Sequence, residues 1–212
     1  NMSTYVNGVA KRHGQVAQDM FPGYPIDSIT NGIHSVTWTS PSFQRLYDRH
    51  IPGWRTDSFA LRHAISLSNQ DIWDAHEQAK ARLVEAVQQR TRQVLSGEAF
   101  TIGFARRATL YKRADLVLSA PHELIDFVRR VGPLQIIFAG KAHPKDEPGK
   151  EMIRRVVQVA KQIEREVRIV YLENYDMGLA QLLTAGVDLW LNTPQRPLEA
   201  SGTSGMKAAH NG

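Results

Sequence analysis

The feature that most constrains the fold is an alternation of short apolar runs with amphipathic segments across the second half of the chain. Apolar runs predict strands at 100–104, 134–139, 167–172 and 187–191. Helical periodicity predicts helices at 115–131, 150–166 and 177–183. Near-continuous apolar strands are typical of a parallel sheet that helices cover on both faces. The sequence therefore predicts an α/β fold with a Rossmann-like, doubly wound parallel sheet.

The chain before this alternation is rich in turns. Dipeptides such as Asn7-Gly8 and Asn31-Gly32 interrupt short apolar stretches, and no sustained periodicity spans the first seventy residues. We expect loops and short elements here, packed on the later part of the chain or on protein outside this chain. A capping-box pattern at Ser68 then opens a predicted helix that runs to about Leu95 and ends at Ser96-Gly97.

Composition excludes several classes of protein. The 42% apolar and 22% charged content is typical of a folded globular chain. The absence of cysteine excludes disulfides and cysteine-bound metals, and the eight histidines lack metal-ligand spacing, so no metal site is expected. No apolar stretch approaches the roughly 20 residues of a membrane span, and the N-terminus lacks a signal-peptide pattern. We therefore expect a cytoplasmic protein without membrane contact.

Four basic residues lie within eight positions directly after the first predicted strand: Arg106, Arg107, Lys112 and Arg113. In open α/β sheets ligands bind at the carboxyl ends of the strands, so the loops that start at Ala105, Gly140, Glu173 and Asn192 should converge on one site. Arginine forks and a lysine ammonium suit phosphate oxygens, and Arg107 and Lys112 are candidates for a phosphate clamp. The alternative is a solvated helix face.

The segment 199–207, EASGTSGMK, comes after the last predicted strand. Its glycines let backbone N–H groups approach an anion, although the spacing is not that of a Walker motif. A lysine beyond such a cradle, Lys207, can form a Schiff base with an aldehyde, and the aldehyde phosphate among cofactors is pyridoxal 5'-phosphate. A flexible connection and an ordinary exposed helix lysine are the alternatives.

Taken together, several motifs in this order resemble the glycogen, starch and maltodextrin phosphorylases. They are VNGVA, TNGIH with a later Trp38, RRxxxYKR, AGKAHP, LENY and EASGTSGMK, of which the last is the most specific. The resemblance covers most of the chain and implies an internal fragment of a GT-B enzyme, which has two Rossmann-like domains around a cleft. Residues 1–30 would be the tail of the N-terminal domain, 31–97 linking loops and a helix, and 98–212 the truncated C-terminal, cofactor-binding domain.

The resemblance also implies a role for each motif residue. Lys207 would carry pyridoxal phosphate, with Arg106, Gly202, Thr203 and Gly205 near its phosphate and with Trp38 and Tyr175 near its ring. Arg107 and Lys112 would bind the substrate phosphate. Glu199, Ser201, Gly202 and Asn31 would hold the glucosyl unit, with Tyr111 as a support behind them.

The reaction implied is the transfer of a terminal α-1,4-linked glucose from glycogen, starch or maltodextrin to orthophosphate, with retention, to give glucose 1-phosphate. SGTSGMK in place of SGTGNMK, and the form of the segment around Arg106, are similar to the shorter bacterial and archaeal branch. The resemblance allows a homodimer of the full-length enzyme. We expect the chain alone to be inactive, and Lys207, five residues from its last residue, to be weakly held.

Two other interpretations remain open. A nucleotide-sugar-dependent GT-B glycosyltransferase similar to glycogen synthase would share the fold and use a basic cluster, but it has no reason to keep Lys207. A nucleic-acid-binding module would explain the net charge of +5, yet no interleaved aromatic residues or nucleic-acid motif accompany the cluster.

Overall fold

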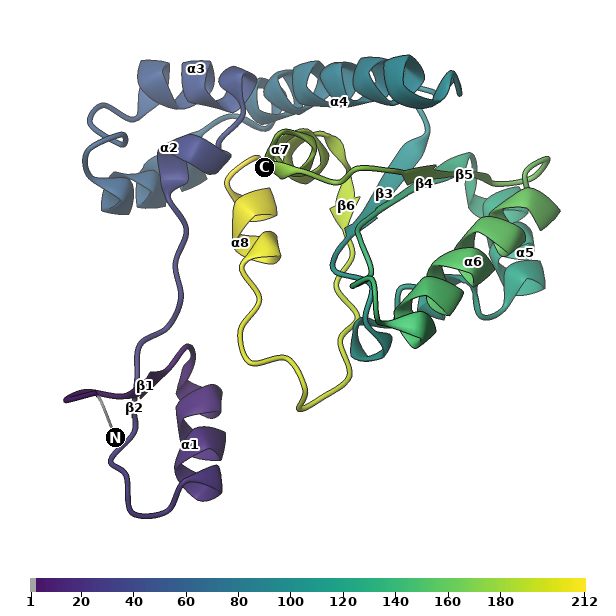
Figure 1. Cartoon of the computed structure of the whole chain (residues 1–212). Coiled ribbons are helices and arrows are strands. Elements are labelled where there is room, and N and C mark those ends of the chain that lie inside the picture. The colour runs from purple at the N-terminus through teal and green to yellow at the C-terminus, as the bar shows by residue number, and fades with distance from the viewer. Residues whose placement is uncertain (1–2) are drawn as a thin grey trace.

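The centre of the molecule is a four-stranded parallel sheet. In the computed structural model, which describes residues 3–212, the strand order is β5-β4-β3-β6 and every pairing is parallel (Figure 1). The strands are β3 Phe100–Ala105, β4 Leu134–Ala139, β5 Arg168–Leu172 and β6 Leu189–Trp190. The predicted α/β class and parallel sheet are confirmed.

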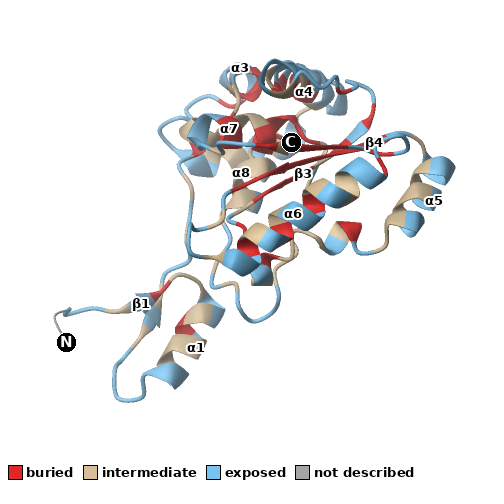
Figure 2. Ribbon diagram, turned by 45° about the vertical axis from the view of Figure 1, so that its right-hand side comes forward, coloured by how far each residue is buried: buried red, intermediate tan, exposed pale blue. Residues whose placement is uncertain are grey.

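Helices cover both faces of this sheet, as the apolar strands predict. They are α4 Asn69–Thr91 and α7 Met177–Gly186 on one face and α5 Pro121–Val131 and α6 Glu147–Gln162 on the other. Residues of β4 alternate between the two cores: Ile137 packs with Leu83 of α4, whereas Ile136 and Phe138 pack with Val156 of α6. The buried strands between the half-exposed helices are visible in Figure 2. Burial on both faces explains why the strands are apolar throughout rather than alternating.

Several predicted boundaries are wrong for local reasons. The helix predicted to reach Leu95 ends at Thr91, because Arg92 adopts a left-handed conformation with φ of 59°. The helix predicted at 115–131 is a 3-10 turn, η3 Leu116–Leu118, followed by α5, which begins at a proline that suits a first helical turn. The predicted capping box is confirmed, since Ser68 Oγ accepts the N–H of Asp71.

Three further ends are shifted. The helix predicted at 150–166 spans 147–162, because the Asp146 carboxylate accepts the N–H of Gly149 and starts the helix early. The helix predicted at 177–183 continues to Gly186. The predicted strands 167–172 and 187–191 begin later, and Val187 instead donates its N–H to Leu183 at the end of α7.

The expectation of loops and short elements in the first seventy residues is confirmed, since no helix within residues 3–66 is longer than ten residues. The region contains α1 Lys11–Met20, α2 Ser35–Trp38, α3 Pro41–His50 and the 3-10 helix η1 Ser58–Ser66. In α3 the Ser40 hydroxyl caps the helix, and Phe43 and Leu46 join Trp54 in a third core against Ala75 of α4. The expected packing on the later part of the chain is confirmed for α3 and η1.

The first thirty residues form a small unit of their own. Strands β1 Asn7–Gly8 and β2 Asp27–Ser28 pair in parallel, with α1 between them. This unit lies apart from the rest of the molecule, and an extended segment leads from it to α2 (Figure 1). Its assignment to a separate N-terminal domain, and a division near residue 97, stay predictions. None of the helices within residues 3–212 is long and apolar enough to cross a membrane.

Candidate functional site

The carboxyl edge of the sheet brings four loops together. Strand β3 lies between β4 and β6, so the chain order reverses here, and such switch points form the ligand crevices of open α/β sheets. Arg106 donates its N–H to Ala139 O at 3.2 Å, and Tyr171 donates its hydroxyl to Gly140 O at 3.1 Å. Gly140 has φ of +144°, and a Cβ there would lie 2.0 Å from Arg106 O, so the close approach requires glycine. Glu199 from the loop after β6 and Tyr175 from the loop after β5 also lie near Arg106, so the predicted convergence of the loops is confirmed.

A cluster of two cations around one carboxylate occupies this edge. Glu199, from the loop after β6, accepts hydrogen bonds from Arg106 at 2.6 Å and from the Lys112 ammonium. Lys112 ends a short 3-10 helix, η2 Leu110–Lys112, and is buried. Burial raises the pKa of Glu199, but the Lys112 hydrogen bond and the Arg106 charge outweigh it and lower the pKa overall. The three residues therefore form a compact polar centre with excess positive charge.

Hydrogen bonds to backbone carbonyls hold the two loops of this cluster against each other. Arg113 Nε donates to Thr193 O at 2.7 Å, and Gln195 donates its N–H to Tyr111 O at 2.7 Å. The Lys112 ammonium also lies 4.6 Å from the centroid of the Tyr111 ring. Tyr111 thus supports Lys112 directly, while Arg113 serves to fix the loop that carries Glu199.

Lys207 forms a second group with Trp38. The last helix, α8 Ser204–Ala209, directs the Lys207 ammonium onto the Trp38 ring at 3.7 Å from its centroid. Both side chains are half-buried. Burial lowers the pKa of Lys207, which increases the fraction of free amine at neutral pH. An aromatic face with a desolvated amine is a suitable place for an aldehyde to be captured.

The expectation that Lys207 is weakly held is wrong. His210 Nε2 lies 3.0 Å from Ser35 Oγ, and the Tyr47 hydroxyl donates to His210 O at 3.0 Å. Asn211 is buried and binds the backbone between α2 and α3. The sequence separations in these contacts are 163 to 175 residues, so no local pattern marks the residues involved.

Four other predicted site residues, Tyr175, Thr203, Gly202 and Gly205, lie next to the groups just described. Tyr175 is half-buried; burial raises its pKa and the neighbouring charge of Arg106 lowers it, so these two residues are close. Thr203 O accepts the N–H of Lys207 at 3.2 Å. A Cβ at Gly202 would lie 3.8 Å from Glu199 Oε1, and one at Gly205 would lie 3.7 Å from the Asn192 amide, so both backbones are open to a ligand.

Three predicted site residues have side chains that are not bonded to the Glu199 cluster or to the pair of Lys207 and Trp38. Within the described part of the chain, the side chains of Arg107, Asn31 and Ser201 make no hydrogen bond or ion pair. Arg107 is exposed, and the other two are half-buried. Their side chains are therefore available to a ligand, and their roles stay predictions.

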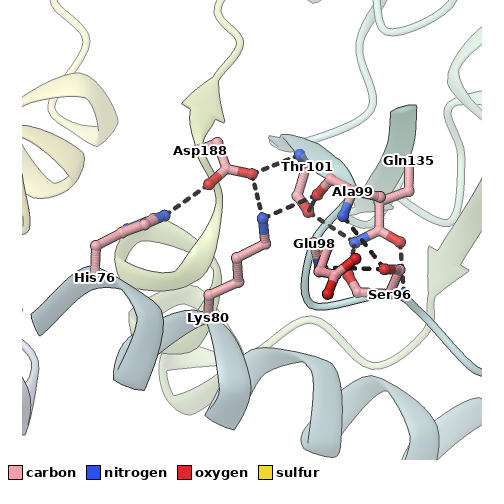
Figure 3. Close-up of polar contacts among 8 residues, drawn as sticks. All are labelled: His76, Lys80, Ser96, Glu98, Ala99, Thr101, Gln135 and Asp188. Carbon is pink, nitrogen blue, oxygen red and sulfur yellow. Dashed lines mark hydrogen bonds and ion pairs between the residues drawn. The ribbon is translucent and has the colours of Figure 1, made fainter. Parts of the chain in front are cut away.

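A second polar cluster, which sequence reasoning missed, lies at the amino edge of the sheet (Figure 3). Asp188, directly before β6, binds His76 Nε2 and Lys80 Nζ of α4 at 2.7 Å each and the Thr101 N–H at 2.7 Å. Gln135 extends the network through Thr101 Oγ1 at 2.7 Å. These hydrogen bonds tie α4 to the sheet. Because the cluster lies at the opposite edge of the sheet from Glu199, it takes no part in the candidate site.

Comparison with known proteins agrees with this arrangement. The family model for carbohydrate phosphorylase matches residues 1–212. The chain is 40% identical to the maltodextrin phosphorylase of Thermococcus litoralis, with 99% of the chain and 28% of that protein aligned. It is 38% identical to the glycogen phosphorylases of Aquifex aeolicus and Mycobacterium tuberculosis, covering 34% and 27% of their lengths and 100% and 97% of the chain. The chain thus spans about a third or less of these relatives, and it belongs to the carbohydrate phosphorylase family.

Proposed function

We propose that the chain forms the cofactor- and phosphate-binding part of an α-glucan phosphorylase. The reaction is the transfer of a terminal α-1,4-linked glucose from glycogen, starch or maltodextrin to orthophosphate, with retention. The observation that carries the proposal is the combination of a half-buried amine, Lys207, with a cation cluster at the topological switch point of the sheet. Relatives named for maltodextrin and glycogen phosphorolysis support the substrate class.

The residues present fit pyridoxal 5'-phosphate. Lys207 has a pKa lowered by burial and an aromatic face beside it, which suits covalent attachment of an aldehyde. Gly202 and Gly205 leave backbone exposed, and Arg106 offers a guanidinium to a phosphate. Trp38 and Tyr175 would flank the ring. When bound, the cofactor supplies a phosphate group able to exchange a proton with the substrate phosphate.

The remaining cations suit the second phosphate. Lys112 is buried and would bind one oxygen as a compact charge, while the exposed guanidinium of Arg107 would close over it from solvent. Two phosphates in one crevice repel each other strongly unless cations lie between them. Glu199 accepts one hydrogen bond each from Arg106 and Lys112, and both cations keep further N–H donors for phosphate. The Glu199 carboxylate would also accept from a glucosyl hydroxyl, next to Asn31 and Ser201.

The test uses this chain inserted into a complete relative. A chimera replaces the aligned segment of the Thermococcus litoralis maltodextrin phosphorylase with residues 1–212, and Lys207→Ala is compared with Lys161→Ala, an exposed lysine on α6. We expect Lys207→Ala alone to abolish glucose 1-phosphate release and the borohydride-trapped cofactor adduct.

Retained phosphorolysis in Lys207→Ala would sink the proposal. Glucosyl transfer from UDP-glucose or ADP-glucose without orthophosphate would instead support the nucleotide-sugar-dependent glycosyltransferase. We also expect the chain alone to release no glucose 1-phosphate, because it spans about a third or less of the length of its phosphorylase relatives.

A further inference from the structure

The helix that carries Lys207 is too short to be stable by itself. Helix α8 has six residues, and isolated helices below about 12 residues are marginal in water. Its position must therefore come from contacts with other elements. Helix α8 packs on α7, and Ser204 at its start shares hydrogen bonds with Asn192, while the residues after Lys207 hold its end against α2 and α3.

Asn211 makes the densest of these contacts. Its side-chain Nδ2 donates to Lys207 O and to Trp38 O, both at 2.8 Å, and its Oδ1 accepts the Ser40 N–H at 2.7 Å. The residue is 2% exposed. One carboxamide thus binds the backbone of the lysine, the backbone of its aromatic partner and the cap of α3 at the same time.

The chemistry of these three partners selects the side chain. Two carbonyls require two N–H donors, and one backbone N–H requires an acceptor at the other end. A rotated amide would set its NH₂ against the Ser40 N–H and its oxygen against two carbonyls, so the orientation is fixed. Aspartate supplies no donor, serine supplies one, and alanine leaves all three backbone groups without this partner.

We propose that Asn211 is the positioning residue of the cofactor lysine, because it fixes the last turn of α8 to the corner between α2 and α3 and holds Lys207 against Trp38. The proposal rests on the proposed function, in which Lys207 carries the cofactor. According to this proposal, the distance between the Lys207 amine and the Trp38 ring depends on the hydrogen bonds of Asn211. Loss of the carboxamide should let the ammonium leave the ring before the whole chain unfolds.

The experiment compares Asn211→Asp and Asn211→Ala with Gln135→Ala in this chain. Gln135 is a matched control, since it is also a buried carboxamide with three side-chain hydrogen bonds, but it lies at the amino edge of the sheet. The first readout needs no cofactor. The chain is labelled with ¹³C at lysine Cε, and the Lys207 resonance, assigned with Lys207→Arg, should be shifted upfield by the Trp38 ring current.

The second readout is the borohydride-trapped adduct at Lys207 as a function of pyridoxal phosphate concentration. We expect both Asn211 variants to lose the upfield shift and to need about tenfold more cofactor, the effect of about 1.4 kcal/mol. Gln135→Ala should keep both properties although it unfolds at a lower temperature. Asn211→Asp keeps the Ser40 contact, so a similar loss there assigns the effect to the two donors.

The two hypotheses fail differently. An unchanged Lys207 shift and an unchanged cofactor titration in both Asn211 variants overturn the positioning role. An equal loss in Gln135→Ala also overturns it, because the effect would then be one of general stability. The proposed function fails on its own if Lys207 gives no trapped adduct in the chain or in the chimera. The positioning role of Asn211 would still stand in that case, provided that the wild-type chain shows the ring-shifted Lys207 resonance and the Asn211 variants lose it.

Discussion

At the scale of single residues, Asp188 is a carboxylate with three hydrogen-bond donors around it. It receives two side-chain donors of α4 and a backbone N–H of β3, and its side chain is 8% exposed. Burial raises the pKa of Asp188, but the hydrogen bonds from His76, Lys80 and Thr101 and the Lys80 charge lower it from 3.8 to about 2. The carboxylate therefore stabilises the fold only while it is ionised.

The sign of the pH dependence is set by this pKa. The contribution of ionised Asp188 to the free energy of unfolding is about 2 kcal/mol. It is fully present above about pH 4 and is lost as the pH falls toward 2. We expect urea unfolding of the chain to show this loss, and Asp188→Asn to remove it. The variant should also be about 3 kcal/mol less stable near neutral pH, because Lys80 then stays buried without a counter-charge.

Asp126→Asn is the control for that measurement, since Asp126 is exposed on α5 and has only a weak ion pair with Arg129. It should keep the acid dependence of the wild type. The same loss of stability between pH 4 and 2 in Asp188→Asn as in the wild type would show that other carboxylates are responsible.

Glu199 leads to a second prediction at this scale. Its carboxylate neutralises part of the charge of Arg106 and Lys112, the cations offered to phosphate. Glu199→Gln keeps the size of the side chain and removes the negative charge, so we expect the chain to bind orthophosphate about threefold or more tightly at low salt. Calorimetric titration measures this, with Glu173→Gln, an exposed glutamate in the loop after β5, as control.

Salt should oppose the effect of Glu199→Gln on phosphate binding. The gain should shrink as ionic strength rises, because screening weakens the added attraction. Weaker phosphate binding in Glu199→Gln at low salt would mean that the carboxylate is needed to hold the two cations in position, and would contradict the prediction.

At the scale of elements, the contact of α4 with α7 depends on one glycine. A Cβ at Gly186 would lie 2.7 Å from Leu83 Cβ and 2.9 Å from Ala79 O, so α4 would have to move. We expect Gly186→Ala to destabilise the chain by about 1–3 kcal/mol, measured by thermal or urea unfolding. Gly178→Ala, in the first turn of the same helix, meets only Asp176 Oδ1 at 3.6 Å and should be neutral or stabilising. Equal stability of the two variants would refute the close packing.

Elements inside the sheet were predictable because the two-faced core imposes continuous apolar runs on β3, β4 and β5. The ends of β3 and β4 were predicted to within one residue, but the ends of the helices were not, since Arg92 in a left-handed conformation and the proline at the start of α5 override periodicity. Helix α3 was missed because its ten residues carry too short an apolar stripe to stand out among turns.

The candidate site divides in the same way. Glu199 and Lys207 were candidates because the segment 199–207 resembles a phosphorylase motif, and their roles stay predictions. Asn211 and Asp188 were not, because their roles arise from partners more than 80 residues away in the sequence. Long-range hydrogen bonds leave no periodic signal in a single sequence.

At the scale of the whole molecule, the chain consists of a large body and a small N-terminal unit. The hydrogen bonds of residues 4–30 stay within this unit or reach its immediate neighbours in the chain, Ser3 and Asn31. Large apolar side chains stay exposed on this unit, among them Tyr5, Met20, Phe21, Tyr24 and Ile29. Residues 35–66, in contrast, share the third core with α4 and anchor α8.

The last prediction separates these two parts by truncation. Removal of residues 1–30 should leave the free energy of unfolding of the body within about 1 kcal/mol of that of the intact chain, because none of the described residues 3–30 belongs to the three cores. Removal of residues 1–66 deletes Phe43 and Trp54 of the third core, so it should lower the free energy of unfolding strongly. It also deletes Trp38 and Ser40, the partners of Asn211, so Lys207 should lose its ring contact. Thermal unfolding of both truncated chains checks the difference, and limited proteolysis should cut the intact chain first at 29–34. If the shorter truncation destabilises the body as much as the longer one, the N-terminal unit is an integral part of the fold rather than a separate body.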